Sequence, residues 1–122
     1  MLVAALAAAA LVPVSDGAHR GHGVTLVVRD RHVVRVDTRL RRFVCDPFGD
    51  VGPVRVTVRP DAPIARDGRV RFTAGPPSER LTLRARFRPG GRAGGRLRLR
   101  GTIGTGDPCA SPLRRFVVDS TP

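Results

Sequence analysis

Residues 68–103 carry the strongest pattern in this chain, an alternation of apolar and polar side chains at every second position. Side chains of a β-strand point alternately to opposite faces, so this period predicts strands with one buried face and one wet face. Glycine- and proline-rich turns separate the strands, at 75–78 and 89–95. The polar positions are almost all arginine. The pattern is present in three stretches: Arg69–Thr73, Arg80–Arg88 and Arg96–Ile103.

The remainder of the chain after residue 23 also divides into short strands and turns. Valine is frequent in these stretches, and its β-branched side chain favours a pleated strand. Alternation is poor over 39–45, which predicts a bulge or an edge position there. About eight short strands without a helical stretch predict one all-β domain over 24–120, an antiparallel β-sandwich or small barrel. The further expected strands are Val24–Val28, His32–Val36, Arg39–Cys45, Val54–Arg59 and Leu113–Asp119.

The same alternation predicts which side chains form the core. Apolar residues of one parity within each strand should point inward together. The predicted core is Val54, Val56, Val58, Val70, Phe72, Leu81, Leu83, Ala85, Phe87, Leu97, Leu99, Ile103, Phe116 and Val118.

Residues 1–18 are predicted to be a secretory signal peptide. The apolar run 1–14 is shorter than the roughly 20 residues that cross a bilayer as a helix, and small residues at Gly17 and Ala18 suit cleavage. A buried N-terminal helix is the alternative. Residues 19–23 are expected to form a flexible arm with solvated histidines, although His19 or His22 beside a free amino group could bind copper or nickel. The leader predicts a secreted or cell-envelope protein without a transmembrane helix.

The two cysteines, Cys45 and Cys109, lie far apart in the sequence, at the end of one predicted strand and just before the last. In an exported chain an even number of cysteines predicts a disulfide. A redox site would favour a close C-x-x-C pair, which is absent. The distant cysteines and the few histidines do not form a zinc motif, and no metal is predicted.

The formal net charge of +12 comes from 22 basic residues, all arginine, against 10 acidic ones. One interpretation is contact with a polyanion, such as an acidic wall polymer, an anionic membrane surface or a nucleic acid. The other is a solvated arginine face, because the arginines are spread over every strand. Nucleic acid is disfavoured, since the five phenylalanines alternate inward instead of offering exposed stacking surfaces. The candidate polyanion contacts are Arg84, Arg86, Arg98 and Arg100.

No arrangement of catalytic residues is visible. The serines lie outside any nucleophile-elbow pattern. Asp46 and Asp50 could serve acid–base chemistry or bind calcium, but loop aspartates more often cap turns. The glycines of 90–95 precede no helix that could bind a phosphate at its N-terminus, so they predict a hairpin turn. We therefore predict a protein that is not an enzyme and needs no cofactor.

The chain resembles small secreted two-cysteine proteins of unassigned function from high-GC actinobacteria. The resemblance implies a secreted β-sandwich with one disulfide and transfers no catalytic residue. Relatives usually have tryptophan near the final strand, where this chain has Arg115 and Phe116. The matching residues are Cys45, Pro63, Ile64, Asp67, Gly68, Arg69, Phe72, Ala93, Gly94, Leu97 and Cys109.

These observations lead to a secreted, non-catalytic β-sandwich that binds acidic cell-surface polymers through an arginine-rich sheet face. The alternative is a small secreted inhibitor or ligand carrier with a cavity between the sheets. A degenerate hydrolase would require Asp, His and Ser to meet in the fold.

Overall fold

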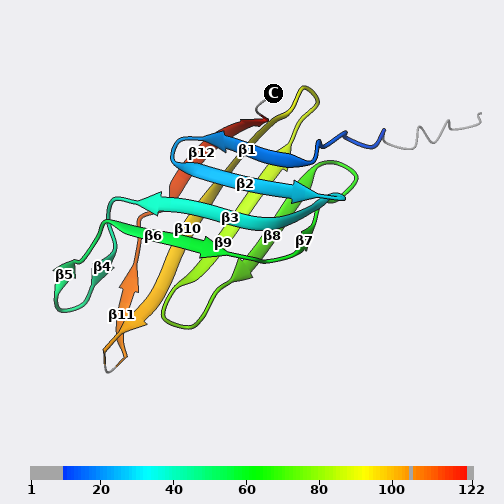
Figure 1. Ribbon diagram of the computed structural model, residues 1–122. Coiled ribbons are helices and arrows are strands. Elements are labelled where there is room, and N and C mark those ends of the chain that lie inside the picture. The colour runs from blue at the N-terminus through cyan, green and yellow to red at the C-terminus, as the bar shows by residue number, and fades with distance from the viewer. Residues whose placement is uncertain (1–9, 105, 121–122) are drawn as a thin grey trace, which may run out of the picture.

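The computed structural model describes residues 10–104 and 106–120, and within them it contains β-strands and no helix. All strands belong to one antiparallel sheet, which curls into a half-barrel (Figure 1). The prediction of an all-β, antiparallel fold is confirmed. The twelve strands are β1 (Gly17–Gly21), β2 (Val24–Arg29), β3 (His32–Leu40), β4 (Val44–Cys45), β5 (Gly49–Asp50), β6 (Val54–Val58), β7 (Ala62–Pro63), β8 (Arg69–Ala74), β9 (Arg80–Phe87), β10 (Arg92–Ile103), β11 (Asp107–Ala110) and β12 (Arg114–Ser120).

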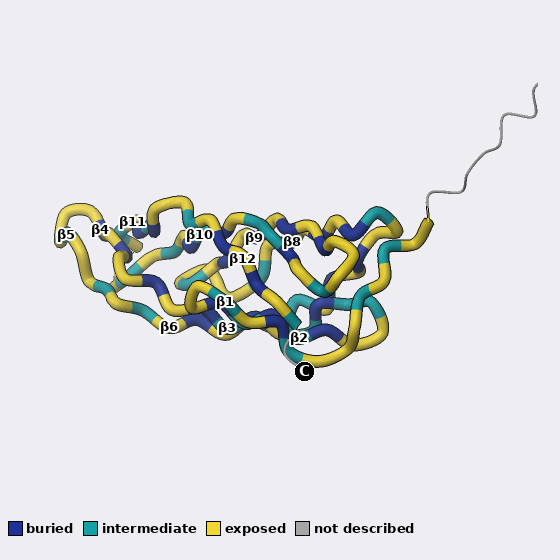
Figure 2. The backbone as a smooth tube through the Cα atoms, turned by 90° about the horizontal axis from the view of Figure 1, so that it is seen from above, coloured by how far each residue is buried: buried dark blue, intermediate teal, exposed yellow. Residues whose placement is uncertain are grey.

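The curled sheet has two halves that face each other across the core. The front half in Figure 1 contains β1, β2, β3 and β6, and the back half contains β8, β9, β10 and β12. Viewed from above, the two halves form two layers, and buried residues recur along the strands of both (Figure 2). Strand β10 is the centre of the back half, because it pairs with β9 along one edge and with β12 and β11 along the other. Strand β12 pairs with β1 and so joins the halves.

The predicted core is confirmed, because all of its residues lie in the apolar cluster between the halves or pack against it. Val54, Phe72 and Ile103 are its partly buried members. The cluster also includes inward residues of β2 and β3 that the predicted list left out. They are Val24, Leu26, Val28, Val33, Val36 and Leu40.

The prediction of a flexible arm over residues 19–23 is wrong, because residues 17–21 form strand β1. His19 is fully buried, and its ring lies edge-on to Phe87 with centroids 5.2 Å apart. Its Nε2 is 3.0 Å from the backbone oxygen of Ser15. The Nδ1 atom of the exposed His22 accepts a hydrogen bond from the Val117 N–H at 3.0 Å. His19 therefore packs in the core, and His22, in the turn after β1, hydrogen-bonds to the backbone of β12.

The predicted signal peptide extends over residues 1–18, of which residues 1–9 lie outside the described part. The backbone N–H of Val12 donates to the Arg66 carbonyl at 2.9 Å. The Asp16 carboxylate accepts a hydrogen bond from the Asp30 N–H at 3.0 Å. The predicted boundary after Ala18 falls inside β1. Within the described residues, no helix is long and apolar enough to cross a membrane.

Two other strand boundaries differ from the sequence prediction. Arg39 and Leu40 end β3, and the expected strand over 39–45 continues only as the two residues of β4. The break follows from the topology, since β3 lies in the front half while β4 pairs with β11. Strand β10 begins at Arg92, so the predicted turn over 89–95 is shorter and the glycines 94 and 95 are strand residues.

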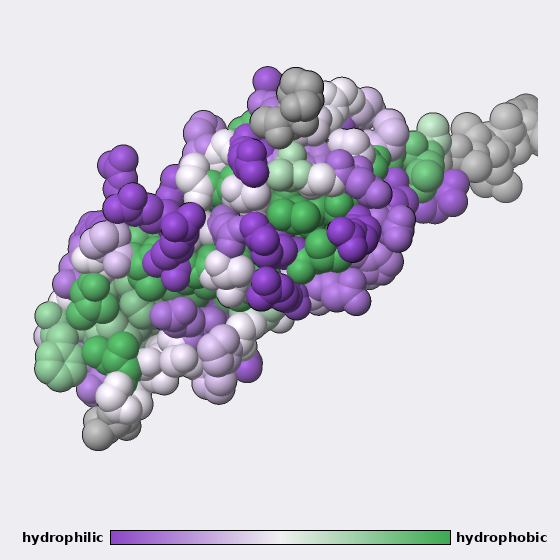
Figure 3. All heavy atoms as spheres, in the orientation of Figure 1, coloured by the Kyte–Doolittle hydropathy of each residue, from purple (hydrophilic) through white to green (hydrophobic). Residues whose placement is uncertain are grey.

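The predicted disulfide is confirmed. Cys45 and Cys109 lie directly opposite each other on β4 and β11, with their sulfur atoms 2.03 Å apart. The bond fastens the short hairpin of β4 and β5 to the end of the back half. Figure 3 shows apolar side chains gathered at this end, where Phe48 and Val51 are exposed.

Candidate anion-binding site on the outer face of the sheet

Four arginines form a line across the outer face of the back half. The strand register places Arg71 of β8 opposite Arg84 of β9, Arg84 opposite Arg96 of β10, and Arg96 opposite Arg115 of β12. We call these four residues the arginine row. Neighbouring strands lie about 4.8 Å apart, so the guanidinium groups of the row start from closely spaced backbone positions. All four residues are exposed.

The arginine row has no carboxylate partner among the described residues. The ion pairs of this face lie beside the row, between Arg69 and Asp67 at 3.4 Å and between Arg92 and Asp119 at 3.1 Å. Like charges directly opposite each other on a sheet are destabilising. The row therefore concentrates positive charge without stabilising the fold.

A hollow of about 810 Å³ opens on this face beside the row. The next cross-strand line contains Gly94 between Arg86 and Val117, and a glycine leaves the sheet surface bare at that point. We call this space the Gly94 hollow. It is lined by Pro63, Ala65, Arg69, Val70, Arg71, Arg84, Ala85, Arg86, Gly94, Gly95, Arg96 and Arg115.

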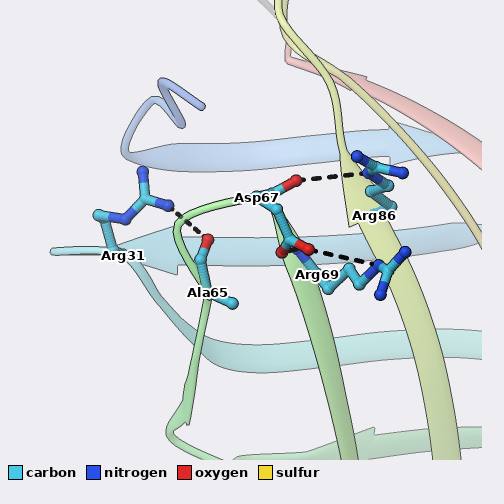
Figure 4. Close-up of polar contacts among 5 residues, drawn as sticks. All are labelled: Arg31, Ala65, Asp67, Arg69 and Arg86. Atoms are coloured by element: carbon cyan, nitrogen blue, oxygen red, sulfur yellow. Dashed lines mark hydrogen bonds and ion pairs between the residues drawn. The ribbon is translucent and has the colours of Figure 1, made fainter. Parts of the chain in front are cut away.

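Asp67 holds two arginines at the rim of the hollow (Figure 4). Its carboxylate contacts the Arg69 Nε at 3.4 Å and accepts the Arg69 backbone N–H at 3.1 Å. Its backbone oxygen accepts a hydrogen bond from the Arg86 Nε at 3.3 Å. Arg31 donates to the Ala65 carbonyl at 2.7 Å and so ties the same loop to the front half. The rim is thus fixed by hydrogen bonds, whereas the row behind it is free to meet a ligand.

The four arginines predicted from the sequence all lie on this outer face. Arg84 belongs to the row and Arg86 to the rim. Arg98 is half-buried and donates to the Ser111 carbonyl at 3.2 Å. Arg98 and Arg100 line a second hollow of about 410 Å³, which shares Arg84 and Arg96 with the first.

Sequence reasoning missed Arg71, Arg96, Arg115 and Gly94. Strand parity does place the three arginines on the wet face, and that signal was present. The row itself depends on the register of four strands, which is set by the three connections from β8 to β9, from β9 to β10 and from β10 to β12.

Of the two loop aspartates, Asp50 caps a turn. The Asp50 carboxylate accepts hydrogen bonds from the backbone N–H of Gly52 at 2.9 Å and of Phe43 at 3.2 Å. These two bonds hold the pKa of Asp50 below its ordinary value, because they favour the charged carboxylate. Within residues 10–104 and 106–120, no three His, Cys, Asp or Glu side chains gather as metal ligands would.

Gly94 and Gly95 are adjacent in β10 but should respond oppositely to substitution by alanine. A Cβ on the inward-facing Gly95 would lie 2.1 Å from the Arg84 carbonyl oxygen and 2.8 Å from the Ala85 Cβ. Overpacking of this kind lowers the free energy of unfolding by about 1–3 kcal/mol. A Cβ on Gly94 would meet only the Phe116 carbonyl oxygen, at 3.8 Å. Since glycine weakens a strand, Gly94→Ala should leave stability unchanged or raise it by about 0.5–1 kcal/mol.

Urea unfolding of both variants, followed by circular dichroism, tests this difference. Equal destabilisation by the two substitutions would contradict the open space above Gly94.

Comparison with protein-family models, with curated proteins and with solved structures finds no match to this chain.

Proposed function

We propose that this chain is an exported, non-catalytic β-sandwich protein that binds acidic polymers of the cell surface through the outer face of β8, β9, β10 and β12. The observation that carries the proposal is the arginine row, in which four arginines on adjacent strands lie opposite one another without a carboxylate partner among the described residues. A polyanion placed along the row would neutralise the repulsion between its members. Binding would thereby gain both the direct attraction and the relief of that repulsion.

The form of the surface also supports a polymer as the ligand. The Gly94 hollow and the second hollow share Arg84 and Arg96, so cationic surface continues along β9 and β10 beyond the row. Guanidinium groups recognise phosphate and carboxylate groups through paired N–H donors. A flexible anionic chain could therefore contact several arginines in succession, whereas a flat protein surface would need matching geometry.

Export is supported by the disulfide between Cys45 and Cys109, since such bonds persist mainly outside the reducing cytosol. The apolar N-terminal sequence supports it as well.

The alternative of a ligand carried between the sheets has less support. The inner faces of the two halves are filled by the apolar cluster, in which Leu81, Leu83 and Leu99 are fully buried. The two hollows described above open on the outer face instead.

The test compares two variants that each lose four positive charges. In one, the arginine row is changed to serine at Arg71, Arg84, Arg96 and Arg115. In the control, exposed arginines of the front half are changed to serine at Arg29, Arg39, Arg55 and Arg59. Binding to purified anionic cell-wall polymer is measured over a salt series.

We expect the row variant to bind at least about tenfold more weakly than the control at physiological salt, because polyanion affinity and its salt dependence scale with the contacts made. Both variants should remain folded, since exposed substitutions usually change stability by less than about 0.5 kcal/mol. Equal losses in the two variants would show that net charge alone governs binding. That result would overturn a specific role for this face.

A further inference from the structure

We propose that the Gly94 hollow is a binding site for a phosphate group and the neutral part of the polymer unit that carries it. This inference rests on the proposed function and narrows it, from acidic polymers in general to phosphate polymers. The ligand class is inferred from the number of arginines that line the hollow and from the strands that carry them.

The donors around the hollow come from four different strands. Arg71, Arg84, Arg96 and Arg115 line it from β8, β9, β10 and β12 in that order. A carboxylate offers two oxygens in one plane, and a single guanidinium fork can pair with both of them. A phosphate group presents oxygens in several directions and can accept from more than one fork at once. Convergence of arginines from several strands therefore favours phosphate.

The positive charge at the hollow is available to a ligand. Asp67 is the carboxylate at the rim, and it is engaged by the side chain and the backbone N–H of Arg69. Arg86 is held by the Asp67 backbone oxygen, which leaves its charge uncompensated. An incoming phosphate would thus meet five lining arginines that have no ion pair among the described residues. They are Arg71, Arg84, Arg86, Arg96 and Arg115.

The size of the hollow indicates more than a single inorganic ion. Its volume of about 810 Å³ falls in the range of sites for small organic molecules, roughly 300–1,000 Å³. Pro63 and Ala65 line it in addition to the arginines, so part of the wall is uncharged. A phosphate at the row with a polyol or sugar toward Pro63 would fill both parts.

Gly94 makes this arrangement possible, because any side chain there would rise from the floor of the hollow. A Cβ at this position meets no atom closer than 3.8 Å, so a larger residue would project into the open space. Gly94→Val would obstruct the floor without changing any charge. Valine is also a better strand former than glycine, so the fold should tolerate it.

The experiment uses titration calorimetry of the full chain with two small anions of comparable charge, tripolyphosphate and butanetetracarboxylate. We expect saturable binding of tripolyphosphate, at least about tenfold tighter than binding of the carboxylate. Gly94→Val should weaken tripolyphosphate binding by about tenfold or more while its thermal unfolding midpoint stays at or above that of the unchanged protein. Thr25→Val, which adds valine on the outer face of β2, is the control and should bind like the unchanged protein.

Equal affinity for the two anions, or tripolyphosphate binding that Gly94→Val leaves unchanged, would overturn the phosphate site. Retention on wall polymer is measured in parallel. If the unchanged protein is not retained on wall polymer but binds tripolyphosphate in a way that Gly94→Val weakens, the proposed function is overturned and the phosphate site stands. If retention on wall polymer depends on the arginine row but Gly94→Val leaves tripolyphosphate binding unchanged, the phosphate site is overturned and the proposed function stands.

Discussion

Replacing Cys45 and Cys109 together by alanine should lower the free energy of unfolding by about 4 kcal/mol. The two residues are 64 positions apart, so the bond between them strongly restricts the conformations of the unfolded chain. Without the bond the unfolded chain gains conformational entropy, and the folded state becomes less stable relative to it. The structure adds a local effect. Strands β4 and β5 have two residues each, and the disulfide joins this hairpin to β11. We expect the hairpin end to open first.

Urea unfolding measures this loss, with circular dichroism as the signal because the chain has neither tryptophan nor tyrosine. A reducing agent should shift the unchanged protein to the midpoint of the double alanine variant and should leave that variant where it is. Coincident midpoints for the oxidised protein and the variant would contradict a stabilising role of the disulfide.

Strands with regular alternation could be predicted from sequence because burial of one face imposes a period of two. In β9, Leu81, Leu83, Ala85 and Phe87 are buried while the residues between them are exposed. The same signal located β6, β8 and most of β10 and their core residues. The pairing of Cys45 with Cys109 followed from composition, since there are only two cysteines.

Strand β1 could not be predicted in this way, because its inward-pointing residue is a histidine. Residues 17–21 contain no large aliphatic side chain, and glycine at both ends is typical of a loop. His19 is nevertheless fully buried, since its ring packs edge-on to Phe87 and its Nε2 meets the Ser15 carbonyl. Phe87 is far from His19 in the sequence, and the Ser15 carbonyl belongs to the backbone just before β1. Neither contact can be recognised from an alternation of side chains.

The candidate site could be predicted only in part, again because a local pattern does not show which residues of different strands lie opposite each other. Parity placed Arg84 and Arg86 on the wet face, but it carried no information on which arginines of other strands lie opposite them. That register depends on the short turn between β9 and β10, in which the Arg88 N–H donates to the Arg92 carbonyl at 2.8 Å. Because the turn closes at Arg92, Gly94 becomes part of the sheet and Arg96 falls opposite Arg84.

Phe87→Ala should lower the free energy of unfolding by about 3–5 kcal/mol, the range for truncating a buried phenylalanine. Phe87 is only 2% exposed, and it is the residue through which β9 meets His19 of β1 across the core. Removing the ring leaves a cavity and takes away the edge contact of a buried histidine. Thermal and urea unfolding of the variant measure the loss.

Phe48→Ala is the matched control, since Phe48 is 67% exposed in the loop between β4 and β5. The same truncation there should change the free energy of unfolding by less than about 0.5 kcal/mol. Similar losses for the two variants would contradict the burial of Phe87 between the halves. Because Phe87 ends the strand that carries Arg84 and Arg86, the proposed binding of wall polymer should also weaken in this variant as the register of β9 loosens. A Phe87 variant that is destabilised yet binds normally would show that the arginine row does not need this anchor.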